Sequence, residues 1–174
     1  MIVLKILSSL LKILGSGTKP AEVAWGFGLG AVLGLTGFHG LFPVVLILIL
    51  CLFRVNLSAA LLSCLLFGLA ARLLDPVFHT IGYTVLAGIP FLVPFWTWLY
   101  NTPVAPLFRF NNTVFMGSLV VSLVLLAPNV LLFQALVVRY RRLWAEKVKK
   151  WKVAKVLGSS NVVRWIIKLK GWGA

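Results

Sequence analysis

Residues 23–53 read VAWGFGLGAVLGLTGFHGLFPVVLILILCLF and contain no Asp, Glu, Lys or Arg. A continuous helix of this length would span about 46 Å, whereas the hydrocarbon core of a bilayer is about 30 Å thick. Two glycines and a proline interrupt the stretch at 36–43, which favours a turn. We therefore expect residues 19–53 to form a helical hairpin. Its two short halves favour a re-entrant hairpin, which enters and leaves the membrane on the same side.

The composition of the whole chain indicates a membrane environment. Of its 174 residues, 61% are hydrophobic and only 11% are charged, and soluble domains are far less apolar than this. Three further stretches, 55–71, 76–108 and 110–138, also lack charged residues. A soluble domain of this size has too little interior to bury so much apolar surface. We expect an all-α integral membrane protein.

Residues 18–138 are expected to form the membrane domain. Within it, 57–74 and 113–138 are apolar and long enough to cross the bilayer. Glycines and prolines punctuate residues 77–100, which end in aromatic residues typical of a membrane–water interface. We expect this part to be a broken or re-entrant segment. The preferred arrangement has two full spans and two re-entrant segments; in the alternative, both halves of the hairpin cross and there are four spans.

The flanking segments are predicted to be amphipathic and cytoplasmic. In residues 1–15, Lys5 and Lys12 share one polar stripe, which predicts a helix lying in the headgroup plane. Lys12 also interrupts the apolar run, which argues against a secretory signal. Residues 139–174 carry most of the net charge of +14, so the positive-inside rule puts both termini in the cytoplasm. Because this tail follows an apolar span, we expect it to contact anionic lipid and not nucleic acid, through Arg139, Arg141, Arg142, Lys147, Lys149 and Lys150.

Three glycines of the first predicted helix, Gly26, Gly30 and Gly34, are spaced by four residues. This spacing puts them on one helical face, where another backbone can approach closely. We expect the face to pack against a partner helix or to hold the hairpin together. Loose packing without a function is the alternative.

Few polar groups interrupt the apolar stretches. Arg72, Asp75 and His79 have a spacing that would align them on one helical face, although Pro76 is expected to end the helix there. Charged groups at membrane depth are unfavourable and are usually paired. The three residues therefore indicate either a polar site for a lipid headgroup or a proton, or an Arg72–Asp75 pair that anchors a helix end at the interface.

Two more positions are candidates for polar chemistry. His39 lies in the predicted turn of the hairpin and could line a polar path; otherwise it is an ordinary interface histidine. Arg109, with Asn111 and Asn112, could bind phosphate; otherwise these residues only mark a loop.

Neither catalysis nor metal binding is expected. The chain holds three acidic residues and two histidines, which is too few for paired-carboxylate catalysis or for a multi-acid metal site. Cys51 and Cys64 lie in apolar stretches without metal-ligand or redox spacing, and we expect them to be small packing residues. The sequence has no recognisable motif for a serine nucleophile, a zinc protease or a nucleotide-binding loop. We expect no enzymatic activity, no cofactor and no metal.

Several short segments resemble a bacterial membrane family called domain of unknown function 2062. The resemblance implies a location in the bacterial inner membrane. In one uncharacterised branch of that family, the gene tends to lie beside a gene for a large periplasmic protein similar to AsmA-type lipid-bridge proteins. The resemblance therefore implies an inner-membrane partner for a lipid conduit. The family has no accepted catalytic residues that could be assigned to positions of this chain. The segments are KPAEVAWGFGLG (19–30), LGLT (33–36) and FRVNLSAA (53–60), and for the branch LDPVFH (74–79), YNTP (100–103) and RFNNT (109–113).

These observations favour an accessory or anchor subunit of a phospholipid transport system, in complex with a large AsmA-like periplasmic protein. One alternative is a small oligomeric transporter or channel that acts alone. Another is a structural membrane protein without a transport role. A single copy offers few polar groups at membrane depth from which to build a solute pore, which favours the first hypothesis.

Overall fold

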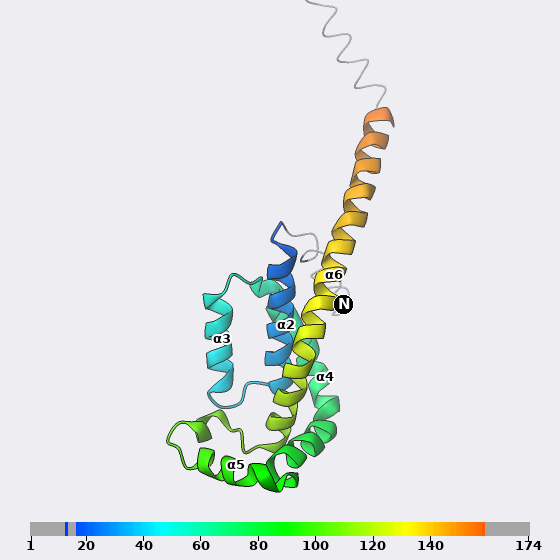
Figure 1. Ribbon diagram of the computed structural model, residues 1–174. Coiled ribbons are helices and arrows are strands. Elements are labelled where there is room, and N and C mark those ends of the chain that lie inside the picture. Colours follow the sequence, from blue (N-terminus) through cyan, green and yellow to red (C-terminus); the bar gives the residue numbers. More distant parts are fainter. Residues whose placement is uncertain (1–12, 14–16, 159–174) are drawn as a thin grey trace, which may run out of the picture. The chain divides into compact units, whose positions relative to one another are not determined.

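A computed structural model describes residue 13 and residues 17–158. For the segment 144–158 it describes the backbone alone. The predicted interfacial helix over 1–15, apart from residue 13, and the end of the tail at 159–174 lie outside the described residues. Every regular element in the described part is helical (Figure 1). The α-helices are α2 (Pro20–Thr36), α3 (Phe42–Leu52), α4 (Leu57–Tyr83), α5 (Val93–Tyr100) and α6 (Thr113–Gly158), with shorter helical turns η1 (Thr84–Gly88), η2 (Pro90–Leu92) and η3 (Ala105–Phe108).

The chain divides into two compact units, Met1–Val137 and Val138–Ala174. The first unit contains α2 to α5 and the part of α6 that ends at Val137. The second contains the rest of α6, whose backbone remains helical as far as Gly158. Helix α6 thus extends beyond the predicted span at 113–138, because no glycine or proline interrupts residues 129–157.

Two helices are long and apolar enough to cross a membrane. They run from Leu57 to Gly88 and from Thr113 to Leu143. Only 22% of an apolar 18-residue segment of each helix is buried inside the protein. A core helix of a soluble protein is mostly buried, so the exposed apolar faces of these two helices favour a lipid environment.

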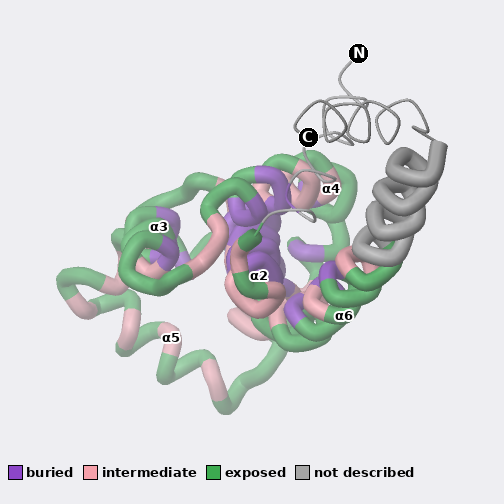
Figure 2. The backbone as a smooth tube through the Cα atoms, turned by 90° about the horizontal axis from the view of Figure 1, so that it is seen from above, coloured by how far each residue is buried: buried purple, intermediate pink, exposed green. Residues whose placement is uncertain are grey.

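Helices α2 and α3 form the predicted helical hairpin. Their bounds lie close to those expected from the sequence, and they lie side by side in both views (Figures 1 and 2). Pro20 occupies the first turn of α2, where its missing N–H leaves no helical hydrogen bond unmade. Leu46 of α3 packs against Val32 and Leu33 of α2.

Helix α4 does not end at Leu74, as the sequence analysis predicted. It begins where Asn56 accepts a hydrogen bond from the backbone N–H of Ala59 (2.9 Å), and it continues through Pro76 to Tyr83. A proline removes only one helical hydrogen bond, and apolar surroundings favour retention of the others because exposed backbone groups find no water there. The predicted broken segment at 77–100 therefore begins as the last two turns of α4, and the chain leaves the helix only at Ile89.

Helix α2 packs directly on the backbone of α4 through the predicted glycine face. A Cβ atom at Gly26 would overlap the carbonyl oxygen of Asn56, and one at Gly30 would overlap that of Ala60. At Gly34 it would crowd the backbone of Cys64 and Gly68. The face thus contacts α4 of the same chain, and not α3. Figure 2 shows the resulting concentration of buried residues along α2.

A second close crossing, which was not predicted from the sequence, joins α4 to α6. A Cβ atom at Gly82 would overlap the carbonyl oxygen of Thr113, and one at Gly117 would overlap that of Phe78. Helix α2 also contacts α6, since the rings of Phe27 and Phe133 stack with centroids 3.7 Å apart. The first unit is therefore built on mutual contacts among α2, α4 and α6.

Replacing Gly30 with alanine is expected to lower the free energy of unfolding by about 1–3 kcal/mol, because the new methyl group overlaps the main chain of α4. Gly68→Ala is the matched control on the same helix pair, since a Cβ there meets only Gly34, at 3.6 and 3.9 Å. Denaturant titration in detergent micelles measures both variants. Equal stability of the two would contradict the close approach of α2 and α4.

Candidate functional site

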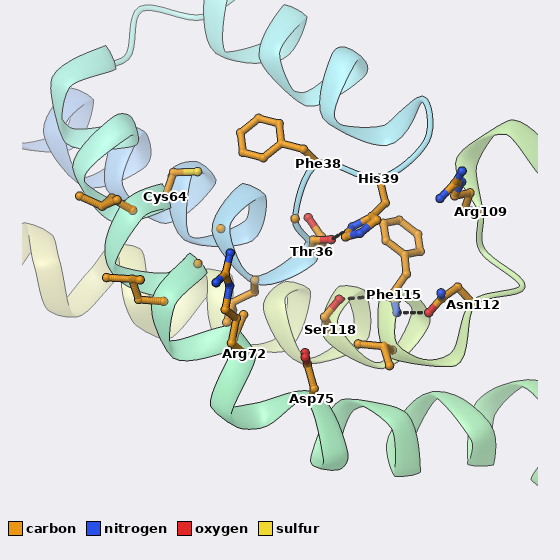
Figure 3. Close-up of a pocket in the computed structure, with 18 of the residues that line it drawn as sticks. Thr36, Phe38, His39, Cys64, Arg72, Asp75, Arg109, Asn112, Phe115 and Ser118 are labelled. Atoms are coloured by element: carbon orange, nitrogen blue, oxygen red, sulfur yellow. Dashed lines mark hydrogen bonds between the residues drawn. The ribbon is translucent and has the colours of Figure 1, made fainter.

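A pocket of about 750 Å³ lies in the first unit, where four segments meet (Figure 3). These segments are the end of α2, the α2–α3 turn, the middle of α4, and the start of α6 with the loop before it. Much of the wall is apolar. The polar side chains that line the pocket are Thr36, His39, Arg72, Asp75, Arg109, Asn112 and Ser118.

The pocket brings together four of the five polar candidates that the sequence analysis identified. His39, Arg72, Asp75 and Arg109 all line it, although they come from three separate segments. His79 does not line it. Its Nδ1 atom forms a hydrogen bond of 2.7 Å with Oγ1 of Thr113, which ties α4 to the start of α6.

Arg72 and Asp75 lie three residues apart on the uninterrupted helix α4, so they share one face. Both are exposed. In the part of the chain that the structure describes, no ion pair or hydrogen bond joins them to each other or to another side chain. The alternative in which an Arg72–Asp75 pair anchors a helix end is therefore wrong in both respects. Both charged groups remain available to a ligand.

Arg109 has a left-handed backbone conformation, with φ 56° and ψ 30°, and no other described non-glycine residue has a positive φ. This conformation is unfavourable for a residue with a Cβ by about 1–2 kcal/mol. Two backbone hydrogen bonds of 3.0 Å stabilise it, one from Arg109 N–H to the carbonyl of Pro106 and one from Asn112 N–H to the carbonyl of Arg109. The loop thus holds the guanidinium at the pocket against a local backbone preference.

Backbone contacts join the α2–α3 turn to the loop that carries Arg109. Gly40 has φ 64°, and a Cβ there would overlap the carbonyl oxygen of Leu107. The N–H of Leu41 donates a hydrogen bond of 2.8 Å to that carbonyl. His39 lies in this turn, and its Nδ1 atom is 3.4 Å from the carbonyl oxygen of Thr36. These contacts bring His39 and Arg109 to one pocket although 70 positions separate them in the sequence.

Several residues of the pocket were not predicted from the sequence. Thr36 and Ser118 were not singled out, and each is buried with its hydroxyl bonded to a backbone carbonyl of its own helix. Asn112 was considered only as a companion of Arg109. Its side chain accepts a hydrogen bond from the N–H of Phe115 at 3.0 Å, so it caps the start of α6. Asn111, predicted beside it, does not line the pocket.

One wall of the pocket is a row of leucines on α4. Leu61, Leu65 and Leu69 are spaced by four residues, line the pocket, and are 72%, 52% and 57% exposed. Arg72, three residues after Leu69, also lines the pocket, so α4 contributes both an apolar wall and a cation to it. Such a combination suits an amphiphile with an anionic head.

The predicted lipid-contacting residues of the tail belong to the second unit. Arg139, Arg141 and Arg142 lie on α6, and Arg139 and Arg142 are exposed. For Lys147, Lys149 and Lys150 the structure describes only the helical backbone. Among the described residues, no three His, Cys, Asp or Glu side chains lie close enough together to hold a metal ion.

Comparison with known proteins identifies a relative. Over 138 residues the chain is 31% identical to an uncharacterized protein of Treponema pallidum (strain Nichols), and the match covers 79% of this chain and 85% of that protein. The chain belongs to the family of this treponemal protein. No family model and no solved structure matches the chain. Membership of the domain of unknown function 2062 family therefore stays a prediction.

Replacing Arg109 with glycine is expected to raise the free energy of unfolding by about 1 kcal/mol, because glycine adopts the left-handed conformation without a Cβ clash. Arg54→Gly is the control, because Arg54 has a negative φ and its replacement relieves no strain. Denaturant titration in micelles measures both. A loss of stability in Arg109→Gly as large as in the control would show that the arginine side chain itself holds the loop.

Proposed function

We propose that this protein is a subunit of a phospholipid transport system in the bacterial inner membrane, and that its pocket receives phospholipid headgroups. One observation carries the proposal: two arginines, Arg72 and Arg109, line a pocket in an apolar chain, and neither has an ion-pair partner among the described residues. Both guanidinium groups are exposed and so are available to bind an anion. The phosphate of a membrane lipid supplies one, and guanidinium binds phosphate through paired hydrogen bonds.

The row of leucines on α4 supports this assignment. A lipid whose phosphate contacts Arg72 can lay an acyl chain along Leu69, Leu65 and Leu61. These side chains are more than half exposed, so they form an apolar wall that an acyl chain can contact and that a free phosphate cannot use. The combination favours a whole phospholipid over an inorganic anion.

The distance between the pocket and the start of α2 supports a site near the outer leaflet. The N–H of Asn56 donates a hydrogen bond of 3.0 Å to the carbonyl of Glu22, which brings the start of α2 beside the start of α4. The pocket lies at the other end of α2, whose 17 residues span about 25 Å. With the start of α2 at the cytoplasmic surface, as the positive-inside rule predicts, the pocket lies almost one bilayer thickness from that surface, close to the periplasmic side.

We extend the proposal to the helical hairpin. Helix α3 has 11 residues and is about 16 Å long, roughly half the thickness of the hydrocarbon core. A bilayer that matches its apolar surface to so short a helix becomes thinner next to it. Local thinning beside the pocket would lower the barrier for a phospholipid that leaves the membrane. The receiving partner in this proposal is a large periplasmic AsmA-like protein, which the family resemblance suggests.

Replacing both Arg72 and Arg109 with glutamine is expected to reduce the phospholipid that remains bound after gentle purification at least tenfold, because the phosphate loses two charge-assisted contacts. Arg54→Gln is the matched control, since Arg54 is exposed and does not line the pocket. Mass spectrometry of the purified, tagged full chain counts lipid per protein. Equal lipid in the double variant and the control would contradict the proposal.

The same purification from the native host tests the partner. A large periplasmic protein that stays bound to the wild-type chain is the expected result. A homo-oligomer without this partner, which moves solutes in liposomes on its own, would contradict the accessory role and support the small-transporter alternative.

A further inference from the structure

We infer that the pocket selects phospholipids whose headgroup carries a primary ammonium group. This inference rests on the proposed function and names the class of lipid that the site binds. The inference is drawn from Asp75, because a negatively charged carboxylate would weaken a site that bound phosphate alone.

Asp75 lines the same pocket as the two arginines and forms an ion pair with neither of them. It lies one helical turn after Arg72 on the same face of α4, and both line the pocket with Arg109 (Figure 3). Within the described residues it has no ion-pair partner. A carboxylate repels phosphate, so its presence weakens a site for a purely anionic headgroup.

A zwitterionic headgroup removes this conflict. Its phosphate can bind Arg72 while its cation binds Asp75, so both charged side chains that α4 contributes to the pocket gain a partner of opposite sign. In ethanolamine phospholipids the cation is two carbons from the phosphate oxygen. Residues three apart on one helix face are neighbours, so a headgroup with so short a linker can contact Arg72 and Asp75 together.

The chemistry of the cation distinguishes amino lipids from choline lipids. A primary ammonium has three N–H donors, whereas a trimethylammonium has none and cannot hydrogen-bond to a carboxylate. Of these two headgroup cations, only the primary ammonium can therefore donate a hydrogen bond to the Asp75 carboxylate.

The test is a competition experiment with the full chain. Delipidated protein in detergent receives an equimolar mixture of phosphatidylethanolamine, phosphatidylcholine and phosphatidylglycerol with identical acyl chains, and native mass spectrometry measures the bound species. We expect the wild type to prefer phosphatidylethanolamine about tenfold over each competitor, the effect of one charge-assisted hydrogen bond. We expect Asp75→Asn to lose the preference while it still binds phospholipid.

Two further variants control for structural damage. Asp75→Glu keeps the carboxylate and is expected to keep the preference. Glu22→Gln removes an acidic group that does not line the pocket, and it is expected to behave as the wild type. If Asp75→Asn fails to fold, Asp75→Ser takes its place: loss of the preference there supports the inference, and its survival contradicts it.

The outcomes separate this inference from the proposed function. Equal binding of the three lipids by the wild type, together with a tenfold loss in Arg72→Gln, would overturn the headgroup selection and leave the lipid site in place. Lipid binding that is insensitive to both arginines would overturn the proposed function itself. A preference that survives Asp75→Asn would show that selection occurs elsewhere in the chain.

Discussion

Direct contact between the backbones of α2 and α4 is the constraint on which the rest of the first unit depends. Helices in lipid gain little from the hydrophobic effect when they associate, so close packing must hold them together. Gly26, Gly30 and Gly34 permit that packing because each contacts the main chain of α4 where any side chain would collide. The register of α2 on α4 then sets which residues of α4 stand opposite the end of α2.

The pocket is a consequence of this register together with the second crossing. Gly82 and Gly117 bring α6 against the far half of α4, so the start of α6 and the loop before it stand beside the end of α2. Arg109 and Asn112 thereby reach the same space as Arg72 and Asp75. Side chains that lie more than thirty positions apart in the sequence therefore meet, because the glycine contacts hold α2 and α6 against different parts of α4.

The sequence predicted the parts of this arrangement that depend on local pattern. The hairpin followed from the glycines and proline at 36–43, and the glycine face followed from a spacing of four within one helix. The end of α4 was misjudged because the effect of Pro76 depends on surroundings that a local rule does not contain. The contact between Gly82 and Gly117 was missed because it joins residues of different helices, and no periodicity within one segment reveals such a pair.

The same limit applies to the candidate site. His39, Arg72, Asp75 and Arg109 were recognisable as polar residues in apolar surroundings, since a charge is unfavourable there without a partner. Their convergence required the fold. The leucine row at 61, 65 and 69 was not distinguishable from any other lipid-facing stripe until its position at the edge of the pocket was known.

The central claim is that a phospholipid headgroup occupies this pocket, and photocrosslinking in the native membrane tests it most directly. A phospholipid with a photoactivatable group in its headgroup would be added to membranes that contain the full chain, and the labelled peptides would be mapped by mass spectrometry. The account predicts that labelling concentrates on the segments that line the pocket, 34–39, 61–75 and 109–118. Labelling spread evenly over the exposed faces of α3, α4 and α6, with none concentrated at those segments, would contradict it.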